Sequence, residues 1–315
     1  MKTISNLKLT AGRNSHLGHY LLLIFVCFIW GGTPASGRTL VQQVSPMLIT
    51  GARFLVAGII LFAWLYLIKD RKAFKPGLYN LKIMILMSVM GICLHNTLLF
   101  KALSITTATN TALIESIGPT ITTILAFLLI GERLSYTGWC GIIISCLGAV
   151  FIVAQGSLDT LLSLKFNNGD LLVVISESMW SGYIVVGWRL GKNISAVALT
   201  AWTSIIGGLV CIIAGALSGS LYYHEIDLSS VISFLYLVFA SGIFAFIAWN
   251  YAVTKVGATK AGVFVYLIPL AGAFIGITIL DEVVKIAQLL GGIVIILGML
   301  ITVRSNLTLK KERST

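Results

Sequence analysis

The feature that most constrains this chain is a series of apolar segments, each long enough to cross a lipid bilayer. A membrane-spanning helix needs about 20 mostly apolar residues. Of the 315 residues, 57% are hydrophobic and 10% are charged, whereas a soluble domain carries about 25% charged residues. This composition excludes a soluble enzyme, a nucleic-acid-binding domain and a disulfide-stabilised scaffold. We place ten spans, at residues 17–37, 48–68, 81–102, 109–130, 135–155, 170–189, 196–218, 229–251, 258–280 and 285–304.

The distribution of Lys and Arg predicts the orientation of these spans. With ten spans, 17 of the 22 basic residues lie on the side of the two termini and 4 lie on the opposite side, while Arg53 lies inside a span. Lys and Arg collect in cytoplasmic loops, so we expect the tails 1–16 and 305–315 to be cytoplasmic. The same bias explains the net charge of +11 without nucleic acid as a partner. The sequence thus predicts a multi-pass protein of a bacterial-type inner (plasma) membrane.

The two halves of the chain repeat each other. A shift of 150 residues aligns the two halves without a gap. We place the first repeat at residues 17–155 and the second at residues 170–304, joined by the segment 156–169. Each half holds five spans, and because five is odd the second half enters the membrane from the opposite side. We therefore expect an all-α fold of ten helices in two inverted repeats, with a site near the bilayer midplane. The matches that chance explains least well are Trp30 with Trp180, Pro119 with Pro269, and Glu132 with Glu282.

Several short motifs connect this pattern to a known family. They are Phe28-Ile29-Trp30-Gly31-Gly32-Thr33-Pro34, Arg53-Phe54, Ala102-Leu103, Thr107-Ala108, Pro119 and Gly131-Glu132-Arg133-Leu134, and in the second half Trp180, Ala252-Val253, Gly257-Ala258, Pro269 and Asp281-Glu282. Through them, residues 17–304 resemble the drug/metabolite transporter superfamily in its ten-helix form with two EamA-type repeats. The resemblance implies a transporter of amino acids, other metabolites, nucleotide sugars or drugs, and it does not choose among these substrates.

A carboxylate and a helix break coincide in the fourth predicted span. Glu115 lies four residues before Pro119, and a proline leaves the carbonyl four residues earlier without its helical donor. A carboxylate beside a free carbonyl suits cation or proton binding. The alternative is a structural ion pair with Arg53 or Lys101. Pro269 makes the matching break in the ninth span and places Tyr266 beside it.

A second acidic residue lies in the middle of the sixth span. Glu177 is followed by Trp180 and Ser181 at three and four residues, so the three side chains share one helical face. An acid beside an indole can hold an amine and stack an apolar substrate, and Trp30 is expected on the opposite wall. Alternatively, Ser and Trp donors cap Glu177 within the bundle, and both Trp residues serve packing.

Three further polar groups lie inside predicted spans. His95, next to Asn96, either couples transport to protons or forms a hydrogen bond between helices. Asn250 either binds substrate or bridges helices. Arg53 either meets a substrate carboxylate, whose geometry suits a guanidinium, or extends to the membrane interface. Glu132 and Glu282, at matching helix ends, are expected to pair with Arg133 or Lys285 or to hold a loop.

No catalytic motif, cofactor motif or metal-ligand cluster is recognisable, and we expect neither enzyme activity nor a cofactor. The sequence predicts a secondary transporter that exports a small metabolite, foremost an amino acid or a related amphipathic compound. Acidic and basic groups near one cavity would suit a zwitterion, with coupling to protons or to the substrate gradient. The rivals are a multidrug or cation exporter, a nucleotide-sugar carrier, a channel and a membrane scaffold. Ten spans can enclose a cavity in one chain, so either a monomer or a homodimer is compatible.

Overall fold

Apolar helices account for nearly all of the described structure. The computed structural model describes residues 17–106, 111, 114–115, 117–154, 156–163, 167–190, 193–268, 270–272, 274, 286–305 and 307–309. Within them, seven helical segments are long and apolar enough to cross a membrane, and three shorter apolar helices cover Gly118–Ile130, Ala258–Gly272 and Leu289–Arg304. Each of these ten helices falls on one predicted span. The prediction of an all-α polytopic membrane protein is therefore confirmed.

The elements of the first half are α2 (Leu17–Gly31), α3 (Thr33–Val41), α4 (Pro46–Leu67), the 3-10 helix η1 (Arg71–Phe74), α5 (Leu78–Met87), the π-helix η2 (Ser88–Leu94), α6 (His95–Leu103), α8 (Gly118–Ile130), β1 (Glu132–Leu134), α9 (Tyr136–Val153) and α10 (Leu158–Leu162). Those of the second half are α11 (Asn168–Leu190), α12 (Ala196–Leu217), α13 (Leu228–Tyr236), the π-helix η3 (Leu237–Ala245), α14 (Phe246–Val256), α15 (Ala258–Val263), the 3-10 helix η4 (Phe264–Tyr266), α17 (Ile286–Arg304) and β2 (Leu307–Leu309).

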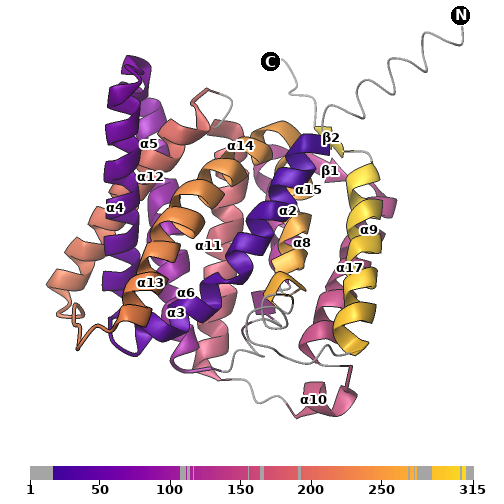
Figure 1. Ribbon diagram of the computed structural model, residues 1–315. Helices are drawn as coiled ribbons and strands as arrows, with labels where there is room; N and C mark the ends of the chain where they lie inside the picture. The colour runs from indigo at the N-terminus through magenta and orange to yellow at the C-terminus, as the bar shows by residue number, and fades with distance from the viewer. Residues whose placement is uncertain are drawn as a thin grey trace, which may run out of the picture.

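The first span is broken where the sequence changes from apolar residues to small and polar ones. Helix α2 ends at Gly31, and α3 starts at Thr33 with Pro34 in its first turn, where a missing amide hydrogen costs nothing. The span runs on to Val41, four residues beyond its predicted end at residue 37. Figure 1 shows α3 on the side of the bundle opposite to the start of α2. We call the side where α2 begins and α17 ends the terminal side.

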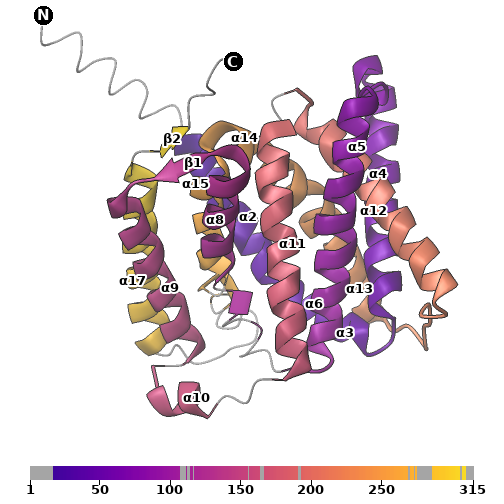
Figure 2. The ribbon, with the colours of Figure 1, turned by 180° about the vertical axis from the view of Figure 1, so that it is seen from behind.

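Two helix pairs form the opposite edges of the bundle and show the inverted symmetry directly. Helices α4 and α12 pack at one edge, and α9 and α17 pack at the other (Figures 1 and 2). A Cβ on Gly58 would lie 2.9 Å from the backbone nitrogen of Ile205, and a Cβ on Gly208 would lie 2.8 Å from that of Leu55. We call residues 150 positions apart repeat mates. Gly58 thus contacts Ile205, while its mate Gly208 contacts Leu55, the mate of Ile205. A twofold axis between the halves requires this crosswise pattern.

The third and eighth spans each contain a π-helical segment at matching positions. Residues Ser88–Leu94 form η2, and Leu237–Ala245 form η3, so seven residues of each are repeat mates. A π-helix inserts an extra residue into a turn and misaligns backbone carbonyls with their α-helical donors. The hydrophobic pattern predicted both spans as plain α-helices. The structure corrects this prediction, because the hydrophobic pattern that identifies a span is nearly the same for both helix types.

Residues at the terminal side tie the two halves together. Glu132 accepts hydrogen bonds through Oε2 from the backbone nitrogen of Thr259, at 3.2 Å, and from its Oγ1, at 2.8 Å. The Glu132 carboxylate thereby caps the start of α15, where the helix dipole favours negative charge. From the sequence we expected an ion pair of Glu132 with Arg133 or a loop contact, and Thr259 was not predicted as its partner. A short antiparallel ribbon pairs Glu132–Leu134 with Leu307–Leu309, which was also not predicted. Glu282 lies outside the described residues.

Candidate functional site

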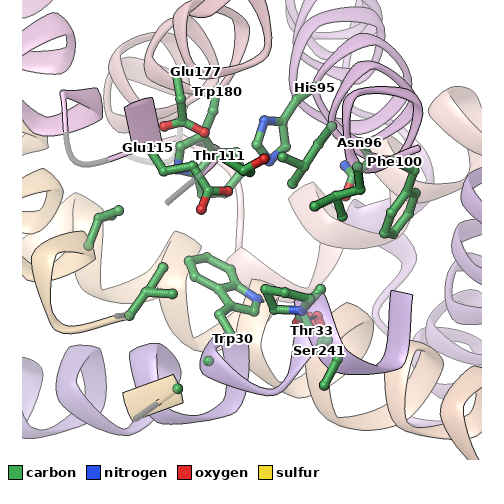
Figure 3. Close-up of a pocket in the computed structure, with 18 of the residues that line it drawn as sticks. Trp30, Thr33, His95, Asn96, Phe100, Thr111, Glu115, Glu177, Trp180 and Ser241 are labelled. Carbon is green, nitrogen blue, oxygen red and sulfur yellow. Dashed lines mark hydrogen bonds between the residues drawn. The ribbon is translucent and has the colours of Figure 1, made fainter. Parts of the chain in front are cut away.

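A cavity of about 520 Å³ lies in the middle of the bundle (Figure 3). Its lining comes from the first, third, fourth, sixth, eighth and ninth spans, the six that inverted symmetry places between the halves. Arg53 of α4 adds a seventh span. Of the residues predicted to form a site, eight line this cavity: Trp30, Arg53, His95, Asn96, Glu115, Glu177, Trp180 and Tyr266.

The two proline breaks differ in what the structure shows of them. Glu115 is helical and Ile117 forms a turn, after which α8 begins at Gly118 with Pro119 in its first turn. The fourth span is thus interrupted just before Pro119, directly beside Glu115. Pro269, the predicted break of the ninth span, lies outside the described residues.

The acidic wall of the cavity consists of Glu115 and Glu177. Figure 3 shows their carboxyl groups on the same side of the cavity, next to Trp180. Glu177 is buried, and its carboxylate lies against Gly118, where α8 begins, so that a Cβ at this position would displace Oε2. Ser181 does not cap this carboxylate. Its hydroxyl donates to the carbonyl of Gly118 at 3.2 Å.

Aromatic rings form the floor of the cavity toward the terminal side. The repeat mates Trp30 and Trp180 meet edge to face, with centroids 5.3 Å apart and an interplanar angle of 81°. Phe246 packs edge-on against both indoles. Trp30 also donates through Nε1 to the carbonyl of Ser241, within η3, at 3.4 Å. The indoles are therefore fixed in place and present an apolar surface between the two halves.

His95 connects two helices at the cavity edge. Its Nδ1 lies 2.9 Å from the hydroxyl oxygen of Ser176 on α11, and its ring stacks on Trp180 with centroids 5.1 Å apart. The contact with Ser176 is a hydrogen bond between helices, one of the two roles that the sequence suggested for His95 beside proton coupling. The His95 ring also lies between the acidic wall and Asn96 in Figure 3.

Arg53 is buried among aromatic rings rather than extended to the interface. It is 2% exposed, and its guanidinium carbon lies 4.4 Å from the ring centroid of Phe54 and 5.5 Å from that of Phe100. Nη2 donates to Oδ1 of Asn96 at 2.5 Å. Among the described residues, Nε and Nη1 have no hydrogen-bond partner. The alternative in which Arg53 reaches the membrane interface is therefore wrong.

Asn250, by contrast, does not line the cavity. Its Nδ2 donates to the hydroxyl oxygens of Tyr183 at 2.9 Å and Thr200 at 3.0 Å, so it joins α14 to α11 and α12. Other lining residues were not predicted from the sequence. Arg38 is exposed on α3, and Thr33 shares a hydrogen bond with Ser241 at 3.1 Å. The only feature of the sequence that could have identified these lining residues was their position on helices that flank the repeat interface.

The described residues contain no group of three or more His, Cys, Asp or Glu that could hold a metal ion. The cavity lining combines two carboxylates, one buried cation and a pair of indoles.

Comparison with known proteins decides the family. The model of the EamA-like transporter family matches the chain twice, over residues 17–154 and 167–304. The chain belongs to the EamA-like transporter family. The resemblance inferred from the motifs is thus confirmed, and membership in this family indicates transport rather than catalysis.

Relatives span the whole EamA pair. The uncharacterized transporter YyaM of Bacillus subtilis (strain 168) is 27% identical over 291 residues, which cover 90% of this chain and 93% of YyaM. An uncharacterized transporter of Archaeoglobus fulgidus is 28% identical and is covered over 96% of its length. A solved crystal structure superposes with a TM-score of 0.73 at 17% identity and covers 90% of this chain. That likeness shows the fold alone.

Proposed function

We propose that this EamA-family protein is a secondary transporter that exports amino acids or related amphipathic compounds by alternating access. The observation that carries the proposal is the composition of the cavity between the repeats. Glu115 and Glu177 supply negative charge on one wall of the cavity. Arg53 of α4 supplies a positive charge. Trp30 and Trp180 form an apolar floor. A zwitterion with an apolar side chain has groups that complement all three.

The position of the cavity within the bundle supports a gated pathway. It extends from Trp30, at the end of α2, to Arg38 on α3 and Leu103 at the end of α6, away from the terminal side. On the terminal side the first span packs against the ninth, and the ring of Tyr20 stacks on that of Phe264 with centroids 5.6 Å apart. The Lys and Arg distribution makes the terminal side cytoplasmic. The structure would then represent the state that releases an exported substrate to the outside.

Both repeats of one chain contribute to the cavity lining, which is compatible with transport by a monomer or by each chain of a homodimer. If transport is coupled to the proton gradient, Glu115 and Glu177 are the carboxyl groups of the cavity that would carry the proton.

The test is counterflow in liposomes that contain the purified protein. Pooled labelled amino acids are compared with pooled nucleobases and sugars, and wild type is compared with Glu115→Gln. Glu225→Gln, which changes an exposed loop residue, is the matched control. We expect saturable amino-acid exchange that Glu115→Gln loses and Glu225→Gln keeps. No exchange by folded wild-type protein would refute the amino-acid assignment.

The paired acids favour one second candidate, the export of cationic amphipathic compounds. For such a substrate, neutralising Glu115 or Glu177 would abolish transport of a cationic dye while Arg53 would be dispensable. Dye efflux by the same proteoliposomes distinguishes the two functions, since a zwitterion carrier needs both signs of charge.

A further inference from the structure

The guanidinium of Arg53 is a buried cation that lacks a counter-ion among the described residues. Its single hydrogen-bond partner there is the neutral Asn96, and Nε and Nη1 have none. Burying a charge without a paired and hydrogen-bonded partner is strongly unfavourable in a protein interior, and in a bilayer such residues face a partner or a water-filled cavity. Arg53 lines the cavity, so a ligand can provide what the protein does not.

Asn96 holds the guanidinium in one orientation. Its Nδ2 donates to the carbonyls of Gly91 and Ile92, both at 3.0 Å, and these carbonyls belong to the π-helix η2. An Asn amide has two N–H donors, and both are used here. The amide oxygen must therefore face away from η2, toward Arg53. The carbonyls that orient Asn96, which in turn orients Arg53, thus belong to the π-helix.

The second repeat has neither a cation nor an amide at the positions that match Arg53 and Asn96. The mates of Arg53 and Asn96 are Thr203 and Phe246. The hydroxyl of Thr203 donates to the carbonyls of its own helix, and Phe246 packs against the indoles. A scaffold that needed a cation at this point for packing would need it in both halves. Its presence in one half alone indicates a role in recognising the ligand.

We propose that Arg53 binds the carboxylate of the transported compound, and that Asn96 and η2 position it. The proposal rests on the proposed function and narrows it to substrates that carry a carboxylate. A guanidinium matches a carboxylate in charge and donor geometry. Phe54 and Phe100, which flank it, keep water away and strengthen the interaction.

The experiment uses the purified full chain and three probes that share a phenyl ring: phenylacetate carries only a carboxylate, phenethylamine carries only an amine, and L-phenylalanine carries both. Binding is read from the shift in Tm and from quenching of Trp fluorescence. Arg53→Met keeps the apolar stem of the side chain, and Lys101→Met removes an exposed cation of α6 as the matched control. We expect phenylacetate to bind wild type and Lys101→Met alike. Its affinity for Arg53→Met should fall about 10- to 100-fold.

The Tm without ligand separates recognition from a structural role. Because Arg53 is uncompensated, Arg53→Met should keep or raise the Tm of the empty protein. A lower Tm with unchanged phenylacetate affinity would overturn the proposal. If Arg53→Met fails to fold, Asn96→Asp replaces it as the test. The new carboxylate should occupy Arg53 and exclude phenylacetate, and phenylacetate binding at wild-type affinity would overturn the proposal.

The remaining outcomes separate this proposal from the amino-acid assignment. Arg53-dependent binding of phenylacetate without amino-acid exchange would keep the carboxylate site and refute the amino-acid substrate. Amino-acid exchange that Arg53→Met leaves intact would keep the amino-acid substrate and refute the carboxylate site at Arg53. Equal Tm shifts from chloride, phosphate and phenylacetate would show a general anion site and overturn the assignment to a substrate carboxylate.

Discussion

The two repeats share their helix contacts and differ in their chemistry. Gly141 and Gly291 are mates, as are Gly148 and Gly298, and the close approaches run crosswise: Gly141 to the Gly298 carbonyl and Gly148 to the Gly291 carbonyl. At the cavity the correspondence ends. Arg53, Asn96 and Glu115 in the first half have Thr203, Phe246 and Val265 as mates.

This difference separates two kinds of constraint on the sequence. Contacts between helices must work in both halves, because the same surfaces pack about one pseudo-twofold axis. A small ligand has no such symmetry, and its polar and apolar parts need different partners. The polar groups that line the cavity from the first half, with Glu177 from the second, therefore mark where recognition departs from the scaffold.

The largest effect should follow from breaking the shared scaffold. A Cβ on Gly298 would lie 2.5 Å from the backbone nitrogen of Ser145, and one on its mate Gly148 would lie 2.8 Å from that of Ile295. Backbone atoms cannot yield as side chains do, so Gly298→Ala and Gly148→Ala should each cost about 3 kcal/mol of stability. Gly18→Ala, which meets nothing within 4 Å, is the control. Denaturant titration in detergent measures all three, and a loss in only one of the two mates would contradict the symmetry.

A smaller effect should separate the cavity from the scaffold. Asn96→Leu and Asn250→Leu each remove a buried amide that joins polar groups, so each should cost about 2 kcal/mol. Only Asn96 orients a cavity residue. In counterflow with L-phenylalanine, Asn96→Leu should raise KM, whereas Asn250→Leu should leave KM at its wild-type value. A raised KM in both variants would mean that Asn250 also acts on the ligand.

The smallest effect concerns the terminal side. Glu132→Ala removes the carboxylate that caps α15 through Thr259, and it should lower stability by about 1 kcal/mol. Arg133→Ala tests the ion pair that the sequence suggested. Arg133 lies over the ring of Phe127 at 6.0 Å, so we expect a change within about 0.5 kcal/mol. If Arg133→Ala lowered stability more than Glu132→Ala, the contacts of Arg133 and not the Glu132 cap of α15 would stabilise the terminal side.

The sequence was sufficient for the spans and the repeat because both depend on residue type and spacing along the chain. It also singled out eight of the residues that line the cavity, since charged residues such as Arg53, Glu115 and Glu177 stand out in apolar helices. It could not predict the π-helices, which change the backbone without changing the hydrophobic pattern. The burial of Arg53 and the partner of Glu132 depend on Phe100 and Thr259, which are distant in sequence and meet these residues only in the folded bundle.

The most direct test of the account replaces three recognition residues of the first repeat with their mates. The variant Arg53→Thr, Asn96→Phe, Glu115→Val adopts side chains that the same scaffold already carries at positions 203, 246 and 265. Counterflow of L-phenylalanine is measured beside the Tm. We expect a folded protein that exchanges no L-phenylalanine. Exchange at the wild-type rate would contradict the claim that recognition resides in these residues.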